Sequence, residues 1–515
     1  MTASPTSPEA RPVSLPAHVD VLVVGSGFAG MGVTERILRA DPTADVLIIE
    51  RAHDVGGTWR DNTYPGVACD VPTSLYSFSF APHANWSHTF ARGPEIYDYL
   101  RGVADGFGIR ERLITGCALL GAQWDDERCL WRVSTELGDL TARVLVAATG
   151  TLSTPKLPDV PGLESFTGHT FHSATWDHDY DLTGKRVAVV GTGASAIQFV
   201  PEIAPVAEHL HVFQRTPAWV IPRMDRTRGP VERWFYRRAP WTLEAQRGAI
   251  YAYREMYVEM MAKRPKLLSI AHSIATGFLR LKVRDGGLRK RLTPGYTIGC
   301  KRMLLSNDWY DTLQRPDVEL VDSGLASVTP TGVVDRDGRE REVDAIVFGT
   351  GFTPTEPPVA HLVRDSAGTT LAQRWGGSPR AYRGTTMSGF PNLFLMYGPN
   401  TNLGHSSIVY MLESQAAYVE SALREMANRG VDAVDVEPAA VDDWNRSLDV
   451  DLAGTVWNTG GCSSWYLDKS GRNSAMWPTF TWKYRKATSV FDIDNYRTVR
   501  RAVTDPRLEP EVTAS

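Results

Sequence analysis

The chain has 515 residues, of which 43% are hydrophobic and 22% charged, and its formal net charge is −4. This length exceeds what one compact core holds, so we expect a globular protein of two or three domains. A net charge so near zero gives no long-range attraction to nucleic acid or to an anionic membrane. No apolar run reaches the roughly 18 residues of a membrane span, so we expect no transmembrane segment.

The N-terminal residues 1–18 are rich in Ser, Pro and Thr and contain no apolar signal-peptide core, which predicts a disordered leader. The cysteines are odd in number and none belongs to a Cys-x-x-Cys pair. This pattern predicts reduced thiols in a cytoplasmic protein and argues against a dithiol reductase. The five cysteines are Cys69, Cys117, Cys129, Cys300 and Cys462.

The first predicted element is a strand at 19–24, which ends directly at the turn Gly25-Ser26-Gly27-Phe28-Ala29-Gly30. A helix at 31–39 follows this turn. Strand, glycine turn and helix form the unit that binds a dinucleotide pyrophosphate at the helix N-terminus. The next strand, 45–49, ends at Glu50, whose carboxylate suits the hydroxyls of an unphosphorylated ribose. A purely structural glycine turn is the alternative.

Further candidate cofactor residues follow the second strand. Gly57-Thr58-Trp59 is a glycine turn before a large aromatic residue, which lets the backbone approach a flat ring system, and Tyr76 is another aromatic candidate. Asp70 is a carboxylate in a Pro/Gly-rich loop, where a turn cap is its alternative role. A later strand, 144–147, is followed by Thr149-Gly150. Such small residues let the backbone pass close to a bound nucleotide, and a simple strand-to-loop connection is the alternative.

A second strand–turn–helix unit begins at 186–190 and continues as Gly191-Thr192-Gly193-Ala194-Ser195-Ala196, with Gln198 in the helix. After a strand at 209–213, the position that an NAD site fills with an acid carries Arg215-Thr216. A guanidinium binds a 2′-phosphate bidentately, whereas an acid repels it. Arg215 and Thr216 therefore favour NADPH over NADH, and a solvated strand-end charge is the alternative for Arg215.

Two longer motifs complete the pattern. One is Gly57-x-Trp59-x-x-x-x-Tyr64-Pro65-Gly66-x-x-x-Asp70, and the other is Phe166-x-Gly168-x-x-x-His172-x-x-x-Trp176-Asp177 between the two glycine turns. Together with those turns, they resemble the class B flavoprotein monooxygenases, and among them the type I Baeyer–Villiger monooxygenases, over about residues 19 to 490. The resemblance implies that His172 and Trp176 couple domains and do not touch the flavin.

The resemblance also implies a function. FAD and NADPH would be the cofactors, and O2 and a small-molecule ketone the substrates. One oxygen atom would enter the ketone through a C4a-peroxyflavin, giving an ester or lactone.

Four residues receive roles from the resemblance. Lys301 would help hold the 2′-phosphate, and Arg302 would stabilise the peroxyanion beside the flavin. On sequence alone, an exposed basic pair is their alternative. Asp70 would orient Arg302 and the nicotinamide, and Trp465 would close over NADPH on a mobile loop. Met303 replaces the Pro that many members have after Lys-Arg, so the ketone itself is not predicted.

The resemblance implies an α/β fold with two Rossmann-like dinucleotide-binding domains. The FAD-binding domain would comprise 19–165 and 345–515, and the NADP-binding domain 166–344. Within the NADP-binding domain, the sequence of residues 228–292 predicts helices rich in aromatic and basic residues. We expect an amphipathic cap that buries its aromatic residues, with a membrane-touching or substrate-entry role as the alternative.

Two other functions remain open on the sequence. The first is an N- or S-oxygenating or alkane-oxidising flavin monooxygenase, and the second is a reductase without oxygenation. We expect no metal and no nucleic-acid partner, and the sequence does not predict the oligomeric state.

Overall fold

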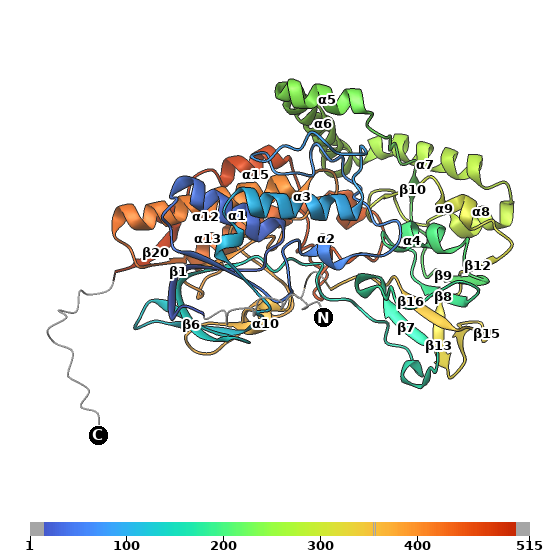
Figure 1. Cartoon of the computed structure of the whole chain (residues 1–515), viewed down its shortest axis with the longest axis horizontal. Coiled ribbons are helices and arrows are strands. Elements are labelled where there is room, and N and C mark those ends of the chain that lie inside the picture. Colours follow the sequence, from blue (N-terminus) through green and yellow to red (C-terminus); the bar gives the residue numbers. More distant parts are fainter. Residues whose placement is uncertain (1–14, 354, 356, 501–515) are drawn as a thin grey trace, which may run out of the picture.

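The computed structural model describes residues 15–353, 355 and 357–500, so most of the predicted leader at 1–18 lies outside the described residues. Two large sheets organise the chain, and each contains a strand that leads into one of the glycine turns (Figure 1). The predicted α/β fold with two Rossmann-like units is confirmed.

The first sheet is mixed. The strands next to the one that leads into the first glycine turn are parallel, and three further strands form an antiparallel meander. Its strands are β1 (His18–Val24), β2 (Val46–Glu50), β3 (Leu113–Thr115), β4 (Leu119–Asp125), β5 (Leu130–Thr135), β6 (Gly138–Ala147), β17 (Val363–Arg364) and β18 (Leu393–Leu395). Their order is β17-β4-β5-β6-β1-β2-β3, and β18 also pairs with β6. Because successive side chains of a strand face opposite sides, Val21 and Val23 enter one core, and Leu22 and Val24 enter another.

Helices cover the first of these faces (Figure 1). The long ones are α1 (Phe28–Ala40), α3 (Gly93–Gly106) and α12 (Ile408–Arg429), and α1 packs directly on α12. The other elements of this half are α2 (Thr58–Asp61), α10 (Val359–Leu362), α11 (Leu371–Trp375), β19 (Ala433–Val436), α13 (Pro438–Ala453), α14 (Val456–Thr459), α15 (Thr481–Ala487) and β20 (Tyr496–Val499).

The second sheet is parallel throughout. Its strands, in spatial order, are β12 (Val318–Val321), β9 (His209–Phe213), β8 (Arg186–Val190), β16 (Ala345–Phe348) and β7 (His169–His172). The predicted domain boundary at 345 is therefore wrong, because β16 pairs with β8 and β7. A short apolar strand fits either sheet, so its sequence alone does not assign it. The elements packed around this sheet are α4 (Ala196–Ile203), α9 (Trp309–Thr312), β13 (Leu325–Thr329), β14 (Gly332–Asp335) and β15 (Glu340–Glu342).

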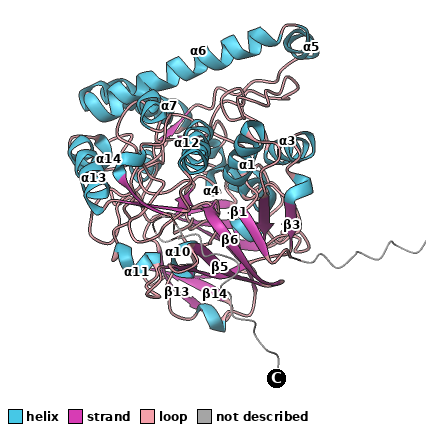
Figure 2. Cartoon of the chain, turned by 90° about the vertical axis from the view of Figure 1, so that its left-hand side faces the viewer, coloured by secondary structure: helices cyan, strands magenta, loops and turns pink. Residues whose placement is uncertain are grey.

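A helical segment interrupts the second unit, and its three longest helices lie in the upper part of the molecule (Figures 1 and 2). Its elements are β10 (Val220–Ile221), α5 (Pro230–Arg238), α6 (Pro240–Val258), α7 (Leu268–Lys282), α8 (Gly286–Leu292) and β11 (Leu304–Leu305). The expectation that this cap buries its aromatic residues is wrong in part, because Trp234, Trp241 and Tyr253 keep 51%, 68% and 57% of their surface exposed. No helix in the described part of the chain is long and apolar enough to cross a bilayer.

Candidate functional site

The first glycine turn joins β1 to α1 and is tightly packed. Gly25 has φ +103°, and a Cβ on Gly30 would lie 1.9 Å from the carbonyl oxygen of Gly25. Only glycine fits at Gly30, so α1 begins directly against the end of β1. The free backbone N–H groups of its first turn are therefore placed where a pyrophosphate binds in such units.

Glu50 lies beside this turn, at the end of β2. Ser26 donates two hydrogen bonds to its Oε2, from the backbone N at 2.9 Å and from the hydroxyl at 2.8 Å, and Arg60 lies 3.2 Å from Oε1. Burial opposes the ionisation of Glu50, but Arg60 and the hydrogen bonds outweigh it, so the pKa lies below its ordinary value. An ionised carboxylate thus lies beside the turn and can accept a hydrogen bond from a ribose hydroxyl.

Phe28, Trp59 and Tyr76 form an aromatic cluster at the same place. The indole Nε1 of Trp59 donates to the Tyr76 hydroxyl at 3.1 Å, and the Tyr76 ring stands edge-on to Trp59 and to Phe28, with centroids 5.6 and 5.1 Å away. A Cβ on Gly57 would lie 3.2 Å from the Cα of Gly27, so the turn at Gly57 touches the first glycine turn. The structure therefore gathers the predicted flavin-side residues in one region.

The second glycine turn joins β8 to α4 and is more open. A Cβ on Gly191 would lie 2.4 Å from the carbonyl oxygen of Gly349, whereas no described atom lies within 4 Å of a Cβ on Gly193. Gly193 and Ala194 are exposed, and Ala196 begins α4. The turn, which also contains Thr192 and Ser195, therefore presents its backbone to open space in front of the helix.

Gln198 on α4 contacts the chain instead of that open space. Its Nε2 donates to the carbonyl oxygen of Ala68 at 3.0 Å, and its Oε1 accepts from the Ala68 N–H at 3.2 Å and from the Tyr64 hydroxyl at 3.1 Å. This side chain fixes the loop that leads to Asp70 against α4. We interpret Gln198 as a positioning residue, where the sequence predicted a cofactor ligand.

Lys301 and Arg215 place two cations near each other at the second site. Burial lowers the pKa of Lys301, and the charge of Arg215 lowers it further. Arg215 and Thr216 are exposed just after β9, and the Lys301 ammonium lies 5.2 Å from the centroid of the Tyr296 ring. An anion between two such cations relieves their repulsion, and a 2′-phosphate has the required charge.

Asp70 and Arg302 form a bidentate ion pair. The Nε of Arg302 lies 2.6 Å from Oδ2 of Asp70, and its Nη2 lies 2.5 Å from Oδ1. Burial opposes the ionisation of Asp70, but Arg302 outweighs it and holds the pKa of Asp70 below its ordinary value. Asp70 in turn raises the pKa of Arg302. Since 38% of the Arg302 side chain is accessible, the site presents a permanent cation to open space.

Three residues around this pair were missed by the sequence analysis. Arg254 on α6 donates to the carbonyl oxygen of Asp70 at 3.4 Å, and Arg223 donates to that of Cys69 at 3.1 Å. Burial raises the pKa of Tyr397 to about 12, although the nearby charge of Arg302 opposes this shift. No local motif marks these residues, because they reach the pair from distant parts of the chain.

A small cavity adjoins this region, next to the ends of β6 and β18. Thr149, Gly150 and Trp465, all predicted cofactor residues, line it together with Tyr397. The cavity therefore connects the loop of Trp465 with the surroundings of Arg302. Its apolar wall includes Val359, Trp375, Leu395, Met396 and Ala475.

Cys300 and Cys462 form a disulfide, which corrects the prediction of five reduced thiols. The two cysteines are 162 positions apart in the sequence. Cys300 directly precedes Lys301, and Cys462 lies three residues before Trp465, so the bond links the segment of the cation pair to the predicted mobile loop. The prediction failed because spacing along the chain does not report cysteines that meet through the fold. Cys69, Cys117 and Cys129 are buried and form no disulfide.

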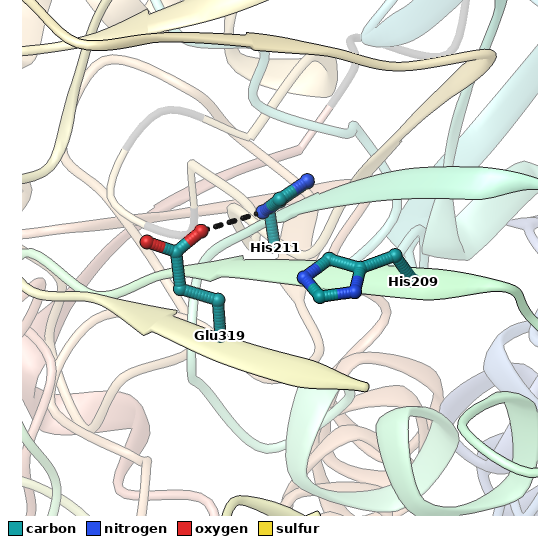
Figure 3. Close-up of side chains that lie close together, drawn as sticks. All are labelled: His209, His211 and Glu319. Atoms are coloured by element: carbon teal, nitrogen blue, oxygen red, sulfur yellow. Dashed lines mark hydrogen bonds and ion pairs between the residues drawn. The ribbon is translucent and has the colours of Figure 1, made fainter. Parts of the chain in front are cut away.

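A second charged cluster lies on the neighbouring strands β9 and β12 of the second sheet (Figure 3). The ligand atoms of His209, His211 and Glu319 lie within 4.8 Å of one another. However, Glu319 also accepts hydrogen bonds from Arg341 at 2.7 and 2.9 Å. This guanidinium neutralises the carboxylate and would repel a metal cation, so we interpret the cluster as an ion-pair network.

The linker motif lies beside the second sheet. His172 is the last residue of β7, and its ring stands 5.9 Å from that of Phe352, just after β16. Trp176 packs on Phe171 and on Phe199 of α4, with ring centroids 5.0 and 5.3 Å away. These contacts attach the linker to α4, which follows the second nucleotide turn, and to the segment after β16.

Comparison with known proteins defines the class. Residues 18–266 match the family model described as flavin-binding monooxygenase-like. The chain is 49% identical to a Baeyer–Villiger monooxygenase of Streptomyces coelicolor, over 94% of this chain and 93% of the relative, and 44% identical to one of Pseudomonas aeruginosa, over 96% and 93%. It therefore belongs to the Baeyer–Villiger monooxygenases.

Solved structures agree with this assignment. A steroid monooxygenase bound to NADP is 31% identical, with a TM-score of 0.83, and a cyclohexanone monooxygenase is 26% identical, with a TM-score of 0.84; each match covers 94% of this chain and all of the other. The predicted family, the cofactors FAD and NADPH, and the activity of an NADPH-dependent flavoprotein Baeyer–Villiger monooxygenase are confirmed. The comparisons do not favour the N- or S-oxygenating or alkane-oxidising alternative.

Proposed function

We propose that this enzyme inserts oxygen into a ketone beside the Asp70–Arg302 pair, and this pair is the observation that carries the proposal. It lies where loops from both nucleotide units meet: Asp70 follows the loop that Gln198 of α4 fixes, and Arg302 follows Lys301. A permanent cation at such a junction is placed to act on both cofactors.

The residues present fit FAD at the first turn and NADPH at the second. The turn at Gly25–Gly30 offers backbone N–H groups to a pyrophosphate, and Glu50 offers an ionised acceptor to a ribose. At the second turn, Gly193 faces open space, and the cations of Arg215 and Lys301 suit a 2′-phosphate. Bound FAD, reduced by NADPH, would supply the activation of O2.

The chain itself contributes position and charge. Arg302 stabilises negative charge that develops on oxygen next to it, because Asp70 keeps the guanidinium cationic and fixed in orientation. Asp70 stays ionised for the same reason and accepts no proton at neutral pH. Trp465, which lines the cavity, would cover the nicotinamide side and exclude water.

We further propose that the ketone has an apolar carbon framework. The cavity wall is mainly apolar, and Tyr397 joins it to the surroundings of Arg302. The cyclohexanone and steroid monooxygenases among the structural relatives are named for substrates of this kind. We also retain the cytoplasmic location as a proposal, since NADPH is supplied there.

The test is a product assay on the purified yellow enzyme with NADPH, O2 and a panel of cyclic, linear and aromatic ketones. We expect an ester or lactone in which one oxygen atom derives from ¹⁸O2. Oxygenated sulfides and amines without an ester from any ketone would contradict the proposal. Arg302→Ala, measured in parallel, tests the position of the site.

A further inference from the structure

Positive charge is concentrated in the helical segment. Residues 228–292 contain fifteen Lys and Arg but only five Asp and Glu, a net charge of +10, whereas the whole chain has −4. The small overall charge therefore hides a strongly basic region in an otherwise acidic molecule. Such a region attracts an anionic partner at a distance of about a Debye length, roughly 8–10 Å at moderate ionic strength.

The outward face of α6 is apolar, which is the reverse of an ordinary surface helix. Trp241, Tyr253 and Met256 are 68%, 57% and 65% exposed. The exposed positions between them carry small residues, and Glu244 is the one charged residue among them. These small residues are Ala245, Gly248, Ala249 and Ala252. Nothing in the described part of the chain covers this face.

The two neighbouring helices repeat the pattern. On α5, Val231, Trp234 and Phe235 are exposed at the spacing of one helix face, with fractions of 77%, 51% and 47%. On α7, Ile270, Ile274 and Leu281 are 59%, 54% and 78% exposed. Figure 1 places α5, α6 and α7 in the upper part of the molecule, and in Figure 2 α5 and α6 form its upper edge with α7 beneath α6.

The opposite face of α6 is firmly attached to the body of the enzyme. Arg247 donates to the carbonyl oxygens of Ser74 and Ser77 at 2.9 and 2.8 Å, and Glu255 accepts from the hydroxyl of Thr481 at 2.7 Å. These bonds fix the rotation of α6. The apolar residues therefore remain outside, and the helix cannot bury them by turning.

We propose that α5, α6 and α7 form a surface, the cap face, that docks on an anionic lipid bilayer. Aromatic side chains of the cap face would enter the headgroup region, while basic residues beside them would contact lipid phosphates. Arg237, Arg238, Lys266 and Arg280 are exposed and suit this role, and Arg238 lies over the Trp234 ring at 5.9 Å.

A bilayer fits the cap face better than a protein does. Exposed aromatic residues beside exposed basic ones match the layered chemistry of a bilayer, whose anionic headgroups overlie an apolar interior that adapts to the shape of the helix. The net charge of +10 also opposes pairing with a second copy through the same face. Since no helix of the described chain can span the membrane, the binding would be peripheral.

The test is co-sedimentation of the FAD-loaded enzyme with vesicles of phosphatidylcholine alone or mixed with phosphatidylglycerol. We expect binding to the mixed vesicles that weakens as salt is added, and little binding to the neutral ones. The variant Trp234→Ser/Phe235→Ser/Trp241→Ser should bind about tenfold less or weaker still, because it loses most of the buried apolar area. Arg237→Glu/Arg238→Glu should weaken binding to the mixed vesicles and reduce its dependence on salt.

A matched control keeps these outcomes interpretable. Leu120→Ser/Leu137→Ser removes two side chains that are 55% and 45% exposed, on β4 and in the turn between β5 and β6, and it should bind like the wild type. Flavin content and NADPH oxidation should be unchanged in all variants, which shows that they fold. Equal sedimentation with and without vesicles would overturn the proposal. So would a dimer in light scattering that the triple variant converts to a monomer, because the cap face would then bind a second copy.

Discussion

Arg302 and Asp70 are joined by two short charge-assisted hydrogen bonds, of 2.6 and 2.5 Å, although 232 positions separate them in the sequence. Their geometry fixes the plane of the guanidinium, and their mutual attraction keeps both groups charged. The pair is thus a preorganised positive charge with a defined direction.

We predict that Arg302→Ala abolishes ester formation while NADPH oxidation continues. Loss of one preorganised charge typically costs about 10²–10³ in rate. O2 that is reduced without oxygenating the ketone should be released as hydrogen peroxide. Stopped-flow reduction of the flavin, peroxide release and ester yield are measured on one preparation. Arg302→Lys is the matched control and should recover part of the ester yield, since it keeps the charge but not the bidentate geometry. A normal yield of ester per NADPH oxidised in Arg302→Ala would show that this residue has no part in the mechanism.

We predict that Arg215→Ala and Lys301→Ala each raise the KM for NADPH about 10–100-fold, with little change in the KM for NADH. Both variants remove one of two cations that face the same place, and only NADPH carries the 2′-phosphate. Lys185→Ala, which changes a lysine before β8, serves as the control. A parallel rise in both KM values would mean that these residues do not recognise the phosphate.

Gln198→Ala should damage the enzyme through the loop of Asp70. We expect normal FAD content and a near-normal KM for NADPH, but a lower kcat and more peroxide, because Ala68 and Tyr64 lose their partner and the Asp70–Arg302 pair is less well oriented. Gln123→Ala, which changes a half-buried glutamine on β4, should have no effect. A rise in the KM for NADPH alone would restore Gln198 to the cofactor ligands.

The network on β9 and β12 gives a prediction about pH. Hydrogen bonds from Arg341, and then from His211, outweigh burial and lower the pKa of Glu319 to about 2. A lowered folded-state pKa adds stability above the ordinary pKa, near 4.5, and this stability is lost as the pH falls toward 2.

Glu319→Gln should therefore cost about 1–3 kcal/mol at neutral pH, and the difference from the wild type should shrink below about pH 4.5. Thermal unfolding followed by circular dichroism at several pH values measures this. Glu111→Gln is the control, because the Glu111 side chain is 82% exposed. A pH-independent difference would show that packing, and not ionisation, explains the loss.

The disulfide predicts a thiol count. Under denaturing conditions without reductant, three thiols should react, and five after reduction. Cys462→Ser should lower the melting temperature, since closing so long a chain segment typically stabilises by about 2–5 kcal/mol. Cys117→Ser leaves the bond intact and is the control for thiol substitution. Five reactive thiols in the untreated protein would contradict the bond.

The sequence predicted those parts of the site that depend on local structure. The two glycine turns are such parts, because a Cβ at Gly30 or Gly191 would collide with a neighbouring carbonyl, and short-range geometry alone demands glycine there. Lys301, Arg302 and Asp70 were found through motifs shared with a family. By contrast, Arg254 and Tyr397 reach the pair through tertiary packing, which no spacing in the chain encodes.

The outward apolar residues of α6 show another limit. The aromatic-rich pattern of 228–292 predicts an amphipathic cap, which led us to expect Trp241 and Tyr253 inside. Periodicity identifies that a helix has an apolar face, but it does not say whether the face meets the core or the solvent. In α6 the polar residues Arg247 and Glu255 face the body, where Ser74 and Thr481 bind them.

The bond between Cys300 and Cys462 also limits how far Trp465 can travel. The chain from Cys462 to Trp465 spans three residues, so the indole-bearing Cα stays within roughly 10–11 Å of its anchor even when fully extended. Trp465 can therefore move only over a short distance and stays close to Lys301. Reduction of the disulfide would remove this tether and widen the range of positions that Trp465 can reach.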